Sequence, residues 1–206
     1  MTRPPFRTVE IGGERLQRID FDHPEVVARV LDEMASGIDV YYDRHWPFTQ
    51  EFCAFLADRP ELVRNRNLLV VGAGVGMEAV IAGRLARRLW INDLAPVAVE
   101  LQMRQLRANG VTVEGTLAGS FAELALPPEV DLVMGCFVVY DENTAAAVEA
   151  MLRRTLAAGI PTLLADLDVG GHFSRLLERF RDDTERIQVP TPDASDPSTI
   201  QVVRVG

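Results

Sequence analysis

Three glycines and one aspartate mark the part of the sequence where residue types and spacing suggest chemistry. Gly72, Gly74 and Gly76 follow an apolar run, and Asp93 ends the next apolar run about 20 residues beyond Gly72. A glycine-rich turn between a strand and a helix lets backbone amides approach a ligand closely. An acid at the end of the following strand can accept hydrogen bonds from both hydroxyls of a ribose. The pattern therefore predicts a site for a nucleoside.

Two better-known glycine turns fit this stretch poorly. A phosphate-binding P-loop requires Gly-Lys-Ser/Thr, whereas Met77 and Glu78 follow Gly76. A dinucleotide-binding turn would carry a third glycine at position 77, where methionine stands. The ligand is therefore expected to be a nucleoside without a pyrophosphate.

The elements that must position this turn form an alternating pattern of strands and helices. Apolar runs without polar alternation are typical of strands buried on both faces of a parallel sheet. We expect such strands at 67–72, 88–92, 111–114, 130–137 and 160–166, with helices between them. Two further β-type runs, 184–190 and 198–205, must pair antiparallel because their connection is too short for a crossover. The sequence predicts an α/β fold, with a Rossmann-like seven-stranded, mostly parallel sheet, a C-terminal antiparallel hairpin and helices on both faces.

The N-terminal region has a different character. Residues 8–19 read as a hairpin around Gly12 and Gly13, and a helix is expected from Asp22, with Glu25 completing a capping box. A second helix over 47–58 places Phe48, with other phenylalanines, on a packing face. We expect a single domain, 1–206, with a hairpin-and-helix part at 1–60 and a Rossmann-like core at 61–206.

Composition narrows the function classes. The net charge of −9 disfavours a nucleic-acid substrate and favours a basic protein or a cationic small molecule. No segment approaches the roughly 20 apolar residues of a membrane span, so a cytoplasmic protein without a membrane partner is expected. Cys53 and Cys136 lie far apart and lack the spacing of a zinc or redox site, so reduced thiols and no metal are expected.

Further motifs carry a family resemblance. They are His45-Trp46-Pro47 with Gln50, the turn VVGAGVG, Asn92-Asp93-Leu94-Ala95-Pro96, Gly135 through Glu142, Leu164-Ala165-Asp166 and Val189-Pro190-Thr191. On these motifs the chain, over roughly residues 40 to 206, resembles a class I S-adenosylmethionine-dependent methyltransferase. It is most similar to the seven-β-strand lysine methyltransferases, especially the electron-transfer-flavoprotein β-subunit lysine methyltransferase branch and its bacterial relatives.

The resemblance implies S-adenosylmethionine as the cofactor and a set of residues that bind it. Asp93 would hold the ribose, Ser120 the adenine amino group and Phe121 the adenine ring, while Trp46 would wall the cofactor and Cys136 would line it through its backbone. The full implied set is Trp46, Gly72, Ala73, Gly74, Gly76, Asp93, Leu94, Ser120, Phe121, Cys136 and Phe137. Asp93 could also cap the helix that follows it, and Trp46 could be plain core.

The implied acceptor is a nucleophilic amine, of which a protein lysine is one example, and two departures from the branch lie where the acceptor should bind. Phe137 stands where the branch has an acid three residues before Tyr140, and DLDVGG at 166–171 replaces an expected Asp-Pro-Gly-Arg. The catalytic candidates are therefore Tyr140, Asp166, Asp168 and His45, with Asp141 favoured as a helix cap.

Each catalytic candidate also has a structural interpretation. Tyr140 could simply pack on the sheet edge, and His45 could be a solvated loop residue. For Asp168, a catalytic role and a structural role are equally consistent with the sequence. Two alternatives to an amine methyltransferase stay open: a small-molecule N- or O-methyltransferase of specialised metabolism, and a non-catalytic S-adenosylmethionine-binding module, which Phe137 motivates.

Overall fold

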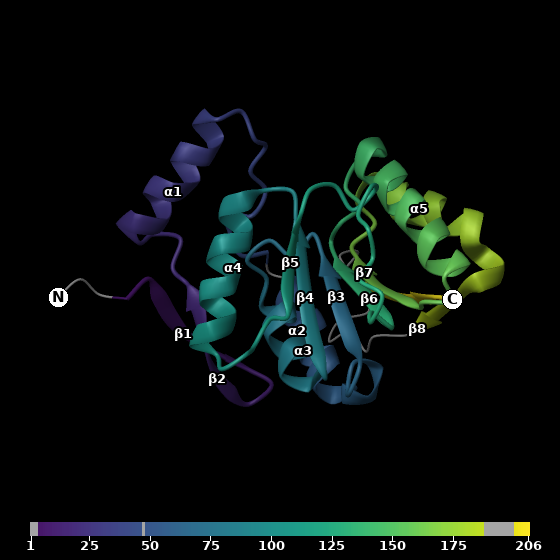
Figure 1. Cartoon of the computed structure of the whole chain (residues 1–206), viewed down its shortest axis with the longest axis horizontal. Helices are drawn as coiled ribbons and strands as arrows, with labels where there is room; N and C mark the ends of the chain where they lie inside the picture. The colour runs from purple at the N-terminus through teal and green to yellow at the C-terminus, as the bar shows by residue number, and fades with distance from the viewer. Residues whose placement is uncertain (1–3, 47, 188–199) are drawn as a thin grey trace.

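The computed structural model describes residues 4–46, 48–187 and 200–206, and it contains a seven-stranded sheet and a separate two-stranded hairpin (Figure 1). The large sheet has the order β5-β4-β3-β6-β7-β9-β8. Its strands are β3 (Asn67–Val71), β4 (Arg88–Asp93), β5 (Gly115–Ala118), β6 (Leu132–Cys136), β7 (Thr162–Asp166), β8 (Thr184–Ile187) and β9 (Gln201–Val205). The first five are parallel, and β9 pairs antiparallel with both β7 and β8. This arrangement confirms the expected fold class and the antiparallel C-terminal hairpin.

Helices cover both faces of this sheet. They are α2 (Phe48–Asp58), α3 (Met77–Leu85), α4 (Pro96–Ala108), α5 (Glu142–Ala157) and α6 (His172–Leu177), with short 3-10 turns at Pro60–Leu62, Val169–Gly171 and Glu178–Asp183. In Figure 1, α4 lies on the left of the sheet and α5 on the right. Every residue of β3, β6 and β7 is buried, as apolar runs without polar alternation predict.

Strand β5 lies four residues later than the sequence pattern predicts. After α4 ends, the Val111 amide donates to the Leu106 carbonyl, and Glu114 donates to Leu89. Residues 111–114 therefore return the chain from the helix to the sheet, and regular pairing with β4 begins at Gly115, opposite Trp90. The expected strand at 111–114 is wrong because the apolar side chain of Val111 is buried by packing next to the helix rather than in the ladder.

The N-terminal hairpin consists of β1 (Phe6–Ile11) and β2 (Glu14–Ile19), and α1 (Pro24–Ala35) follows it. The N-cap of α1 is His23, whose side chain accepts from the Glu25 amide, so the cap expected at Asp22 is wrong by one residue. Side chains of α4 attach β2 to the core: Gln105 accepts from the Ile19 amide, and Asn109 accepts from the Gln17 amide and donates to the Gln17 carbonyl.

Some sequence features fall outside the described residues, namely Pro47 of the Trp-Pro motif and the Val189-Pro190-Thr191 motif. Within the part of the chain that the structure describes, no helix is both long and apolar enough to cross a membrane.

Candidate functional site

The glycine turn joins the carboxyl end of β3 to the start of α3. Gly72 and Gly74 adopt φ values of +56° and +48°, which favour glycine. A Cβ atom built on Gly72 would lie 2.7 Å from Cγ1 of Val138, so this glycine is also required for packing. A Cβ atom on Gly74 would meet only Cβ of Tyr42, at 3.5 Å. The backbone at Gly74 is therefore open to close approach, as the sequence predicts.

Asp93 ties the glycine turn to the neighbouring strand. One carboxylate oxygen accepts from the Gly74 amide at 2.8 Å, and the other accepts from the Ala95 amide at 2.9 Å. Burial raises the pKa of this carboxyl, and the hydrogen bonds from backbone amides oppose that shift. Asp93 and the turn thus form one unit at the carboxyl ends of β3 and β4, while Leu94 beside it is 64% exposed.

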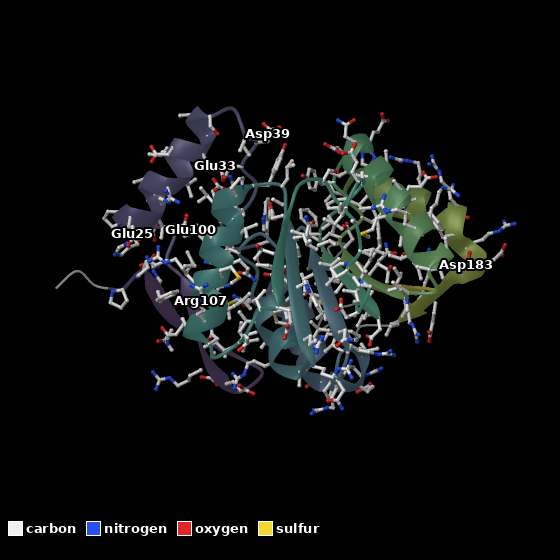
Figure 2. All side chains as sticks on the ribbon, in the orientation of Figure 1. Glu25, Glu33, Asp39, Glu100, Arg107 and Asp183 are labelled. Atoms are coloured by element: carbon white, nitrogen blue, oxygen red, sulfur yellow. The ribbon has the colours of Figure 1, made fainter. Side chains whose placement is uncertain are left out.

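A residue of α1 performs the capping role considered for Asp93. Glu33 is buried, and its carboxylate accepts from the Val97 amide in the first turn of α4 at 2.7 Å. Figure 2 shows Glu33 between α1 and α4. Its second oxygen accepts from the hydroxyl of Tyr42, whose pKa is raised by burial and then by this hydrogen bond. The sequence did not indicate a role for Glu33 or Tyr42. Both precede the glycine turn by 30 or more residues, and no sequence motif connects them to it.

An aromatic cluster, defined here as Tyr41, Trp46, Phe48, Phe137 and Tyr140, lies at the carboxyl end of β6. Phe137 lies near its centre, with ring centroids 4.4 Å from Phe48, 5.4 Å from Trp46 and 6.2 Å from Tyr140. Tyr41 contacts Tyr140 at 5.0 Å. Burial raises the pKa of Tyr140 to about 12.

The structure thus brings three predicted site residues, Trp46, Phe137 and Tyr140, together in this cluster. It adds Tyr41, whose role the sequence did not indicate, and Phe48, which was expected only to pack. Phe137 has φ of +54°, and its amide donates to the Ala165 carbonyl at 2.7 Å. The segment that follows β6 therefore turns sharply toward the end of β7.

The two acids after β7 have different partners. Asp166 is 1% exposed, and its oxygens accept from the Val139 and Asp168 amides at 3.2 and 2.9 Å. Burial raises its pKa to about 7, against these hydrogen bonds. Asp168, at φ +58°, accepts from the amide and the hydroxyl of Ser174 at 2.9 and 2.6 Å. Asp168 therefore fixes the start of α6, and Asp166 fixes the segment before Tyr140.

Two other candidates have contacts typical of structural roles. His45 Nε2 lies 2.9 Å from the Ile19 carbonyl oxygen, its ring packs on Phe21 with centroids 4.7 Å apart, and burial lowers its pKa to about 4. His45 thus faces the N-terminal hairpin. Asp141 forms a capping box with Thr144 at the start of α5, as expected.

The residues proposed for the adenine end lie at the ends of β5 and β6. The Ser120 hydroxyl accepts from the Ala122 amide at 3.2 Å. The Phe121 ring lies 3.7 Å from a Cβ atom built on Gly72, which places it beside the glycine turn. Cys136 is buried at the end of β6, and burial raises the pKa of its thiol well above the usual value. No group of His, Cys, Asp or Glu suited to a metal ion occurs among the described residues.

Comparison with known proteins finds named relatives. No protein-family model matches the sequence. The electron transfer flavoprotein beta subunit lysine methyltransferase of Rattus norvegicus is 27% identical over 130 residues, covering 62% of this chain and 51% of that protein. The Homo sapiens protein of the same name is 28% identical over 117 residues, covering 56% and 44%. The resemblance to this branch is confirmed. The chain spans about half the length of the curated relatives it matches.

Solved structures share the fold. The N-methyltransferase NodS from Bradyrhizobium japonicum WM9, in complex with S-adenosylhomocysteine, matches with a TM-score of 0.60 and 15% identity, covering 86% of this chain and 96% of NodS. The Pyrococcus abyssi tRNA (uracil-54, C5)-methyltransferase, also with S-adenosylhomocysteine, gives 0.63 and 13%, covering 100% and 45%. These matches confirm the predicted Rossmann-like fold.

The expectation of no nucleic-acid partner is wrong. The structural matches include the tRNA methyltransferase above and a 16S rRNA methyltransferase from T. thermophilus. That expectation rested on the net charge of −9, which averages over the whole surface. The charge of one binding face is a local property, so a negative total does not exclude a polyanion.

Proposed function

We propose that this protein is an S-adenosylmethionine-dependent methyltransferase whose acceptor is a nucleophilic amine, with a protein lysine as the favoured substrate. The observation that carries the proposal is the unit formed by the glycine turn and Asp93 at the carboxyl ends of β3 and β4. In open α/β sheets, ligands bind outside the carboxyl ends of the strands. The named relatives supply the amine and lysine part of the proposal.

The residues at the turn fit the cofactor. Gly74 offers an open backbone surface beside Tyr42. The carboxylate of Asp93 accepts from the Gly74 and Ala95 amides, and the Leu94 amide also interacts with it. A carboxylate has about four acceptor sites, so capacity remains for a ribose hydroxyl. Phe121 presents an aromatic ring beside the turn, where a nucleobase could stack. The cofactor would supply an electrophilic methyl group on a sulfonium.

The aromatic cluster fits the acceptor. It lies at the carboxyl end of β6, the strand next to β3, and therefore beside the proposed cofactor site. Aromatic faces attract a cationic amine, by about 0.5–1 kcal/mol when exposed and about 2 kcal/mol when desolvated. With Phe137 in place of an acid, these faces rather than a carboxylate would hold the amine. Both kinds of contact favour the unreactive charged amine, but the aromatic faces do so less strongly than the full negative charge of a carboxylate.

The protein must also obtain the neutral amine. A lysine with a pKa near 10.4 loses its proton at pH 7 at a cost of about 4.6 kcal/mol. The hydroxyl of the half-buried Tyr140 and the aromatic faces can orient the amine, and transfer of its proton to water completes the step. Positioning supplies much of the acceleration in such a displacement. Asp166 would contribute by fixing Val139, and hence Tyr140, in place.

Transfer of a radiolabelled methyl group from S-adenosylmethionine into a cell lysate tests the proposal. We expect label in protein, recovered as methylated lysine after hydrolysis. Label in RNA or in small molecules would overturn the lysine acceptor and leave the methyltransferase class. Absence of both transfer and S-adenosylhomocysteine binding would overturn the class. The matched control is Gly74→Val, which should remain folded without transferring label.

A further inference from the structure

A second acid lies beside the glycine turn, and the proposed function does not use it. Glu78 belongs to the first turn of α3, and it is 3% exposed. Its side chain folds back on the turn, because a Cβ atom built on Gly76 would lie 2.0 Å from Oε1 and 2.2 Å from Oε2. The glycine at position 76 therefore leaves the space that this carboxylate occupies.

The hydrogen-bonding capacity of this carboxylate is only partly used. The backbone amide of Glu78 itself donates to the side chain. Oε2 is buried and accepts no hydrogen bond from any residue that the structure describes. A buried carboxylate oxygen without a partner is costly, and a charged one more so. A hydrogen-bond donor to Oε2 would remove this cost, and a cationic donor would stabilise the charged carboxylate most.

Among the residues that the structure describes, Glu78 interacts electrostatically with the thiols of Cys53 in α2 and Cys136 at the end of β6. Burial raises the pKa of both thiols well above the usual value, and the charge of Glu78 adds to the shift. Both are therefore neutral at physiological pH and supply no cation. No residue that the structure describes supplies a donor to Oε2 of Glu78, and a ligand with a cationic donor would do so.

The position of Glu78 identifies the part of the ligand concerned. In the sheet order β4-β3-β6, Asp93 ends β4, whereas Glu78 follows the turn after β3 and lies near Cys136 at the end of β6. A ligand held by Asp93 at its ribose, with its reactive end toward the aromatic cluster, crosses the turn between them. S-adenosylmethionine carries an amino acid beyond its ribose, and the α-ammonium of that amino acid has three donors.

We propose that the Glu78 carboxylate binds the α-ammonium group of the methionine half of S-adenosylmethionine through Oε2. This inference rests on the proposed function, because it requires the cofactor to occupy the glycine turn. It assigns the two acids different tasks: Asp93 selects the ribose, and Glu78 selects a cofactor whose amino group is intact.

Calorimetric binding of two ligands tests the inference. The first is S-adenosylhomocysteine, and the second is its analogue with a keto group in place of the α-amino group. Glu78→Gln should weaken binding of the first about 10- to 100-fold, as expected for loss of a hydrogen bond between charged groups, and should leave binding of the second unchanged. Glu142→Gln is the matched control, since Glu142 also lies in a first helical turn but is exposed; its affinities should equal those of wild type.

The pH dependence gives a second readout. Burial raises the pKa of Glu78 to about 7. Only the ionised carboxylate attracts the ammonium, so wild-type affinity for S-adenosylhomocysteine should rise about tenfold from pH 6 to pH 8. This rise should disappear in Glu78→Gln, which leaves Asp166, with its similar pKa, in place.

The outcomes separate the two proposals. If wild type fails to bind S-adenosylhomocysteine, the proposed function itself fails. If wild type binds it but Glu78→Gln weakens both ligands equally, or keeps the wild-type pH profile, Glu78 acts on the shape of the turn and the ammonium assignment is overturned. Circular dichroism of each variant establishes that it is folded.

Discussion

Replacing Asp93 tests whether one carboxylate both builds the turn and binds the cofactor. The side chain accepts from the Gly74 and Ala95 amides at 2.8 and 2.9 Å, and it is partly buried. Asp93→Ala leaves two backbone donors without their acceptor. Each such loss costs about 1–3 kcal/mol, so the free energy of unfolding should fall by about 2–6 kcal/mol. That is a large part of the about 5–15 kcal/mol that stabilises a typical domain.

Asp93→Asn separates the two roles. The amide oxygen of asparagine can still accept from one backbone amide, while its NH2 group faces the other donor. We therefore expect a loss of about 1–3 kcal/mol in stability, half of that expected for Asp93→Ala. Affinity for S-adenosylhomocysteine should also fall, by about 1.5–3 kcal/mol, because the ribose loses a charged acceptor.

Urea unfolding and calorimetry on the two variants provide the measurement. The control is Asp141→Asn, which changes in the same way another acid that accepts from a backbone amide, at the start of α5. Its stability should change little, because asparagine and aspartate are similarly good N-caps, and cofactor binding should be unaffected. Unchanged S-adenosylhomocysteine affinity in folded Asp93→Asn would refute the ribose role. Unchanged stability of Asp93→Ala would refute the structural one.

Three further predictions concern neighbouring positions. Gly74→Val should fold with a strain of about 1–2 kcal/mol, because φ is +48°, yet should lose calorimetric binding of S-adenosylhomocysteine; normal binding would make the turn purely structural. Tyr42→Phe removes the hydroxyl that donates to Glu33 and should lower the free energy of urea unfolding by about 1.5–3 kcal/mol, whereas an unchanged value would show that this contact contributes nothing. Asp166 stays protonated in the folded protein up to a pKa of about 7 but ionises in the unfolded chain near 4, so its contribution to stability is present below pH 4 and is lost as pH rises from 4 to 7. Asp166→Asn should flatten this decline in urea unfolding, and an equally steep decline would assign it to other groups.

The central sheet and the glycine turn could be predicted because their signals are local. Apolar runs identified β3, β4, β6 and β7, and the spacing from the turn to Asp93 indicated two adjacent strand ends. The same method failed at 111–114, where the run Val-Thr-Val has the composition of a strand. Instead, the Val111 amide donates to the Leu106 carbonyl near the end of α4, so these residues follow the helix, and regular pairing with β4 begins only at Gly115. Composition alone does not tell which hydrogen-bond partner an apolar segment will find.

The rest of the candidate site could not be predicted, because it depends on contacts between distant segments. Glu33 looks like an ordinary polar residue of an amphipathic helix, yet it caps α4, which begins more than 60 residues later in the chain. Phe48 fits the packing face of α2, and only the fold brings it to Phe137. Glu78 follows the glycine turn, and its residue type and position do not indicate that it is buried. Its partly unpaired carboxylate emerges only when the turn and the neighbouring helix are in place.

The attachment of the N-terminal hairpin to α4 has a consequence for self-association. An isolated two-stranded hairpin is marginal in water, and its open edge offers unpaired amides to a strand from another chain. Here Gln105 and Asn109 accept from the Ile19 and Gln17 amides, so helix side chains occupy the places that a third strand would take. The side-chain amides of Gln105 and Asn109 thereby protect the outer edge of β2 against the addition of a strand from another molecule.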